Sequence, residues 1–109
     1  KRILNLPNTN QVKILDLGTT AASAPGTFLR SAVEYIRITN LDDTNGVAVI
    51  LEDTGGDTAA VLVDADSTLM LVEAFTDGSA FSGWSNIDEI FLKAASANTQ
   101  VEVVVATTA

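Results

Sequence analysis

The side chains best suited to chemistry in this sequence are carboxylates, and most of them lie in one span. Between Ile38 and Leu92 the chain has eleven Asp and Glu residues and no Lys or Arg. Calcium prefers about six to eight oxygen ligands, which closely spaced acidic turns can supply. The tightest groups are Asp42, Asp43 and Asn45, then Asp64 and Asp66, then Asp53 and Asp57. None has the spacing of an EF-hand loop. Asp and Asn also favour turns because their side chains bind nearby amides, so we expect turn residues, with no metal ion and no other cofactor.

The residue types that most enzymes use for nucleophilic catalysis are missing. The chain has no His and no Cys, which excludes Ser-His-Asp and Cys-His arrangements. Lys13 has no Ser close to it in sequence, and Lys93 lies in a strand pattern. Paired carboxylates can hydrolyse glycosides, but six aromatic residues leave little material for a sugar cleft. We therefore expect a protein that is not an enzyme.

Three large aromatic residues, Phe75, Phe81 and Trp84, lie close together in a segment rich in Gly and Ser, 74–84. Rigid aromatic rings bury a large area at low entropic cost, which suits a contact with a partner. The same rings could instead fold back and cap one end of the protein. A platform for sugars is the third interpretation.

The first residues combine positive charge with apolar side chains. Lys1 and Arg2 precede Ile3 and Leu4, and the first thirteen residues carry half of the six basic side chains. Residues 1–10 are therefore a candidate N-terminal arm, with Lys1, Arg2, Ile3 and Leu4 as candidate contacts to an acidic partner. The alternative is an ordinary edge strand over Ile3–Leu6.

Most of the remaining chain alternates with a period of two, which predicts β-strands. Such segments cover Val12–Leu17, Thr27–Ser31, Val33–Asn40, Val47–Glu52, Val61–Val63, Leu69–Val72, Ile90–Lys93 and Val101–Val105. No segment of helical length has a 3.6-residue period. Many short strands at regular spacing favour an antiparallel sandwich or barrel of about eight strands. Several strands are apolar on both faces, which indicates a second cover such as a neighbouring subunit.

Turn signals separate these strands. Asn45-Gly46, within the segment 42–46, predicts a tight hairpin with positive φ. Segments 54–57, 64–67 and 96–99 have the composition of further turns. The long break at 18–26 is rich in small residues and ends in Pro25-Gly26, so we interpret it as a loop.

Size and charge narrow the classes of partner. A chain of 109 residues fits one domain, 1–109. A net charge of −8 disfavours nucleic acid and anionic membranes, which bind clustered Lys and Arg. No apolar run approaches the ~20 residues that cross a bilayer, and the first residues lack the apolar region of a signal peptide. The start at Lys1 rather than Met leaves open the removal of a preceding residue or segment.

The segment Val33–Asn40, with its Ile36-Arg37-Ile38-Thr39-Asn40 pattern, followed by Asn45–Glu52, resembles small structural proteins of tailed bacteriophages. Those proteins combine such a strand with a short hairpin, a Gly-rich turn and a strand that follows an Asp/Ser turn. Here the last element is Asp64–Leu71, and the late segments Ile87–Ala94 and Val101–Val105 are similar too. The likeness covers residues 33–109.

The resemblance implies a jelly-roll-like β-sandwich and a capsid decoration (cement) protein on the outer surface of the virion. Such a protein, commonly a homotrimer, bridges copies of the major capsid protein. We also keep two alternatives open: a tail, collar or fibre component of the virion, and a small glycan-binding β-sandwich module.

Overall fold

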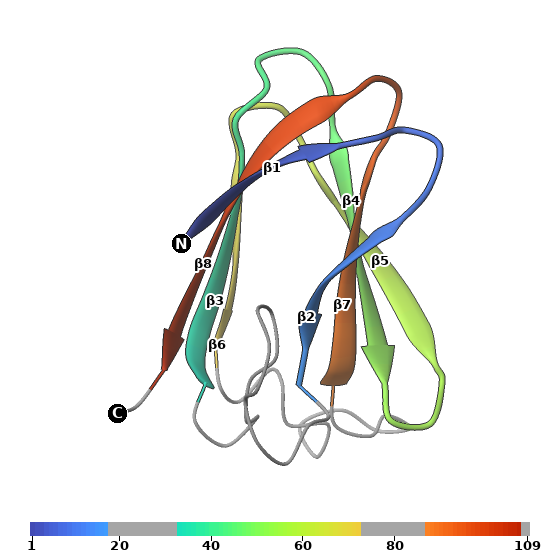
Figure 1. Cartoon of the computed structure of the whole chain (residues 1–109), viewed down its shortest axis with the longest axis vertical. Helices are drawn as coiled ribbons and strands as arrows, with labels where there is room; N and C mark the ends of the chain where they lie inside the picture. Colours follow the sequence, from blue (N-terminus) through green and yellow to red (C-terminus); the bar gives the residue numbers. More distant parts are fainter. Residues whose placement is uncertain (18–32, 73–86, 108–109) are drawn as a thin grey trace.

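The computed structural model describes residues 1–17, 33–72 and 87–107, and these residues form eight β-strands and no helix (Figure 1). The prediction of an all-β chain is therefore confirmed. The strands are β1 (Arg2–Leu6), β2 (Val12–Asp16), β3 (Val33–Asn40), β4 (Val47–Asp53), β5 (Thr58–Val63), β6 (Thr68–Val72), β7 (Ile87–Ala94) and β8 (Thr99–Thr107). The predicted strand at 27–31 and the predicted loop at 18–26 lie outside the described residues.

The strands form two four-stranded sheets, and every pairing between neighbours is antiparallel. Sheet A has the order β1-β8-β3-β6, and sheet B has the order β2-β7-β4-β5. Figure 1 shows β8, β3 and β6 on the left and sheet B on the right. Strand β1 pairs with β8, β2 with β7, β3 with β6, and β4 with β5. These four pairs follow one another along a single long hairpin whose tip is formed by β4 and β5. The hairpin is rolled up, so that β3 also pairs with β8 and β4 also pairs with β7. This is the eight-stranded jelly roll, as the resemblance implied.

The core lies between the two sheets and follows directly from the alternation in sequence. Along β4, for example, Val47, Val49 and Leu51 are buried while the residues between them are partly exposed. The inward residues of the other strands behave in the same way, because successive side chains point to opposite faces of a sheet. The remaining large buried side chains are Leu6, Ile14, Leu15, Leu17, Val33, Ile36, Ile38, Val63, Leu71, Ile87, Ile90, Leu92, Val101 and Val103.

Four of the described connections, residues 7–11, 41–46, 64–67 and 95–98, pass from one sheet to the other and lie at one end of the sandwich, the upper end in Figure 1. Hydrogen bonds join these connections to one another. The side-chain amide of Asn8 donates to the backbone carbonyl of Ser96, and the Ser96 hydroxyl donates to Oδ1 of Asn45. The amide of Asp66 donates to the carbonyl of Asp42. Residues far apart in the chain are thereby fixed to one another at this end.

The predicted tight hairpin at Asn45-Gly46 is wrong. Strands β3 and β4 belong to different sheets, so residues 41–46 cross between sheets instead of reversing one strand onto its neighbour. Gly46 does not have positive φ; among the described glycines only Gly56 does, at 89°. Gly46 is needed for space instead, because a Cβ there would lie 3.1 Å from Cδ1 of Leu62. The true hairpin connects β4 and β5, where Gly56 supplies the left-handed conformation.

A buried charge on β3 should prevent folding. Ile38 is fully buried, opposite Leu69 and Val103 on the neighbouring strands. An unpaired carboxylate at this site costs several kcal/mol, on the order of the whole stability of a small domain. We expect Ile38→Asp to yield no folded protein by circular dichroism. Met70→Asp, on the exposed face of the same sheet and opposite Arg37, is the control that should fold.

The two glycines should respond differently to alanine. Gly56→Ala should cost about 1–2 kcal/mol because it forces a left-handed backbone on a residue with a Cβ. Gly46→Ala should cost less, since only the mobile end of the Leu62 side chain must move. In a chain that also carries Leu62→Ala, Gly46→Ala should no longer lower the stability, whereas Gly56→Ala should lower it as much as before. Urea unfolding of the single and double variants measures both, and rescue of Gly56→Ala by Leu62→Ala would contradict this explanation.

Candidate interaction surfaces

The basic N-terminal segment forms an edge strand in this structure, the second of the two arrangements that the sequence left open. Strand β1 pairs with β8 from Arg2 to Leu6. Leu4 packs against the core, while Ile3 faces outward with 53% of its surface exposed. Of the four N-terminal contact candidates, Ile3 therefore has the most accessible apolar side chain.

Arg2 connects the two sheets. It lies on β1, the edge strand of sheet A, and contacts β2, the edge strand of sheet B. Its guanidinium donates a hydrogen bond to the carbonyl oxygen of Ile14 on β2. The register of β2 against β7 shifts between Lys13 and Leu15, so Ile14 is the extra residue of a β-bulge. A bulge leaves one residue without a ladder partner, and here its carbonyl accepts from Arg2 instead. A hydrogen bond to a charged donor contributes about 1.5–3 kcal/mol.

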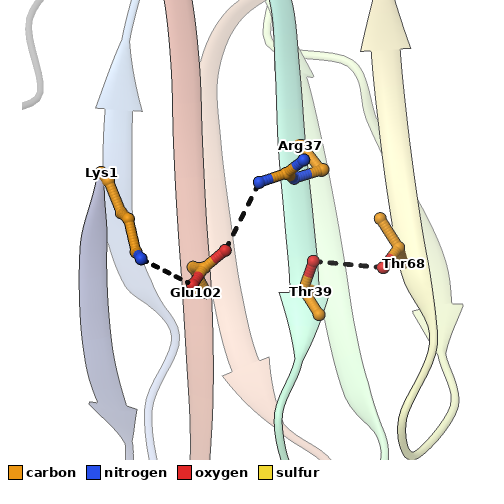
Figure 2. A network of polar contacts seen from close by, with 5 residues as sticks. All are labelled: Lys1, Arg37, Thr39, Thr68 and Glu102. Carbon is orange, nitrogen blue, oxygen red and sulfur yellow. Dashed lines mark hydrogen bonds and ion pairs between the residues drawn. The ribbon is translucent and has the colours of Figure 1, made fainter.

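The outer face of sheet A has a polar network across its middle (Figure 2). Glu102 lies between two basic side chains, with Lys1 Nζ and Arg37 Nη2 each 3.5 Å from one of its oxygens. Beside it, the hydroxyls of Thr39 and Thr68 are 3.1 Å apart and share a hydrogen bond. These residues lie in adjacent rows across β1, β8, β3 and β6. Exposed ion pairs stabilise little, and the same rows also contain the exposed apolar side chains of Ile3, opposite Glu102, and Met70, opposite Arg37.

The outer face of sheet B is different, because apolar side chains cross its middle. In one row Phe91 lies opposite Ile50, and Ile50 lies opposite Ala60 on β5. In the next row Ala48 lies opposite Leu62, whose side chain is 61% exposed. Ile50 and Phe91 are only partly buried. Sheet B therefore has a continuous apolar stripe on the side away from the core, which we call the outer stripe: Ala48, Ile50, Ala60, Leu62 and Phe91.

Charged residues stand at the β2 end of this stripe. Lys13 Nζ lies 3.0 Å from Glu89 Oε2 and 3.7 Å from Asp16 Oδ2. The hydrogen bond and the charge of Glu89, with a smaller contribution from Asp16, raise the pKa of Lys13 above its usual value. Lys13 therefore stays protonated at neutral pH.

The carboxylates of two acidic turns accept hydrogen bonds from backbone amides of the same turn. Asp42 Oδ1 accepts hydrogen bonds from the amides of Thr44 and Asn45, both at 2.7 Å. Asp53 Oδ1 accepts from the amides of Gly55 and Asp57, both at 2.9 Å. In the described part of the chain, no group of three or more His, Cys, Asp or Glu side chains is placed to hold a metal ion.

The remaining predicted contact residues, Phe75, Phe81 and Trp84, lie outside the described residues. The structure therefore brings together Lys1 and Arg37 around Glu102, and Arg2 with β2, but it does not place the aromatic cluster. The outer stripe was not singled out from the sequence, although the apolar residues on both faces of β4 and β7 were its signal.

Comparisons with models of known protein families, with curated proteins and with solved structures find no match to this chain. The jelly-roll assignment therefore rests on strand order and register. Residues 1–17, 33–72 and 87–107 include no helix long and apolar enough to span a membrane.

The hydrogen bonds that Asp42 accepts should make stability depend on pH. The backbone hydrogen bonds from Asn45 and Thr44 lower the pKa of Asp42 below its ordinary value of 3.8. A carboxyl with a lower pKa in the folded chain adds stability above its unfolded pKa, and this contribution disappears as the pH falls through the folded pKa. Asp42→Asn should therefore be less stable than the natural chain at pH 7, and the difference between the two melting temperatures should shrink as the pH falls below 3.8. A constant difference down to pH 2 would contradict this role for the charge.

Proposed function

We propose that this chain is a virion structural protein, a capsid decoration protein that binds the outside of a tailed-phage head and bridges major capsid subunits. The resemblance of residues 33–109 to small phage structural proteins supports it. The strand order supports it as well, since eight-stranded jelly rolls are common in viral capsid proteins. Fold alone does not define function, so the proposal depends on the surfaces.

The observation that carries the proposal is the outer stripe of sheet B, which includes the exposed side chain of Leu62 and is bordered by Lys93 opposite Ala48. The outer face of sheet A instead has Glu102 between Lys1 and Arg37, with the exposed apolar side chains of Ile3 and Met70 as separate neighbours. Exposed contiguous apolar surface typically marks a site where another protein binds. A decoration protein needs such an arrangement, with one face against the capsid and the other in water.

The outer stripe suits a flat partner. Ile50, Phe91 and Ala48 lie in two adjacent rows of a regular ladder, so their side chains form one surface and not a cleft. Burial of this surface contributes about 25 cal/mol per Å², and binding to the folded state alone raises its apparent stability. A domain of this size would then gain part of its stability from assembly.

The oligomeric state in solution distinguishes the proposal from the glycan-binding alternative. A decoration protein of this kind is expected to be a homotrimer in solution, whereas a sugar module should be a monomer that binds oligosaccharide without any capsid. Light scattering gives the mass directly. A monomer whose Trp84 fluorescence responds to oligosaccharide and not to capsids would favour the glycan module.

Co-sedimentation with capsids tests the face itself. The capsids are those of the phage that encodes the chain, assembled without it. Ile50→Lys places a charge in the middle of the outer stripe, and we expect at least a tenfold loss of affinity, or about 1.4 kcal/mol. The control is Thr68→Lys, at an exposed position on the outer face of sheet A.

The expected pattern is retention of binding by Thr68→Lys and loss by Ile50→Lys, with little dependence on salt because the stripe is uncharged. Equal binding by both variants would overturn the role of sheet B. Binding to tails and not to heads would favour the tail, collar or fibre alternative, and no binding to any virion part would overturn the proposed function.

A further inference from the structure

Strand β5 is an unprotected edge of sheet B. Among residues 1–17, 33–72 and 87–107, it pairs with β4 on one side and has no neighbouring strand on the other. Residues Thr58 to Leu62 are all exposed. Val61 alternates with Leu62 and so lies on the inner face, yet it is still 38% exposed. An edge that is apolar and accessible on both faces is a template for pairing with another strand.

The other sheet edges have features that discourage pairing. On the opposite side of the sandwich, β2 has the bulge at Ile14 and the charged pair of Lys13 and Glu89. Strand β1 begins next to Lys1, and its Arg2 side chain reaches across to β2. Strand β6 is also uncharged and regular, but its inner-face residues Leu69 and Leu71 pack against the core. By contrast β5 has no charge, no proline and no register shift against β4, and its inner-face residue Val61 is exposed.

We propose that the free edge of β5 pairs antiparallel with β5 of a second copy of this chain across a two-fold axis. The two four-stranded sheets would then continue as one eight-stranded sheet. A two-fold contact uses the same residues on both copies, so the strand must be complementary to itself.

The residues of β5 meet that condition. Opposite residues of an antiparallel pair point to the same face, so the axis passes beside Ala60 or Val61. With Ala60 at the axis, Leu62 lies opposite Thr58 of the second copy. With Val61 at the axis, Leu62 lies opposite Ala60 and Val63 opposite Ala59. In either register a large side chain meets a small one, because the first half of β5 is small and the second half is large.

Charge determines how the contact should respond to salt. Each chain has a net charge of −8, so two copies repel at low salt. The six residues of β5 add no charge. The nearest carboxylates, Asp57 and Asp64, are exposed at its two ends, and antiparallel pairing brings Asp57 of one copy near Asp64 of the other.

This inference does not rest on the proposed function, because it concerns backbone pairing at the edge of sheet B. Ala60 and Leu62 also belong to the outer stripe, so the test below changes Val61, which lies on the inner face. A two-fold contact joins assemblies in pairs: it gives a dimer from monomers, or a hexamer from trimers built through another surface. Loss of the contact should therefore halve the mass, whatever the starting assembly.

The test compares Val61→Glu with the natural chain by light scattering over a range of protein concentrations. Val61 lies at or beside the axis in either register, so Glu there brings two carboxylates close together, and we expect the mass to fall by half. Met70→Glu, at an exposed position on β6 opposite Arg37, is the matched control and should leave the mass unchanged. Circular dichroism checks that both variants fold.

Two measurements on the natural chain make the test independent of the variants. Hydrogen exchange should show protection of β5 amides that increases with protein concentration. Raising NaCl from about 0.05 M to 0.5 M should strengthen association, since salt screens the repulsion between the acidic copies. A mass unchanged by Val61→Glu, or β5 exchange independent of concentration, would overturn the proposal. A mass halved by Met70→Glu alone would transfer the contact to β6.

Discussion

The Asn40 side chain makes the hydrogen bonds on which the end of the sandwich depends. It is buried at the end of β3, and its amide donates to the carbonyls of Asn45 and Val63 at 2.8 and 3.2 Å. Its Oδ1 accepts from the amide of Asp42 at 2.9 Å. One side chain of sheet A thus holds the crossing to β4 and the last residue of β5 in sheet B. Because a buried polar group left without a partner costs about 1–3 kcal/mol, these bonds fix where the crossing lies. The spacing of the sheets, and hence the two outer faces, follows from that position.

Much of the fold could be predicted from the sequence because alternation is a local property. Val47, Val49 and Leu51 are buried as their spacing indicates, and β3 spans Val33–Asn40 as predicted. Sheet membership is not local. Asn45-Gly46 has the composition of a tight hairpin, but β4 joins β7 and β5 instead of β3. The choice is made by residues more than forty positions away, such as Leu92, which lies opposite Val49. No short-range signal carries that information.

The interaction surfaces were less accessible to sequence reasoning. The charge at Lys1 and Arg2 suggested a contact with a partner, yet both side chains bind within their own chain, to Glu102 and to the backbone of Ile14. The outer stripe depends on register, because Phe91 and Ile50 are 41 residues apart in sequence and become neighbours only when β4 pairs with β7. Apolar residues on both faces of these strands indicated a second cover, but only the ladder shows that their outward residues form one surface.

The pairing of the first strand with the last has a consequence for synthesis. Leu6 lies opposite Thr99, so the β1 ladder cannot form until residues 99–103 have left the ribosome. At about 5–20 residues per second, β1 waits on the order of ten seconds for its partner. During that time Ile3 and Leu4 are available to other chains, and nascent copies on one message are close neighbours. Expression at lower temperature, or a chaperone that binds short apolar segments, should therefore improve the yield of folded protein more than any change to the finished surface.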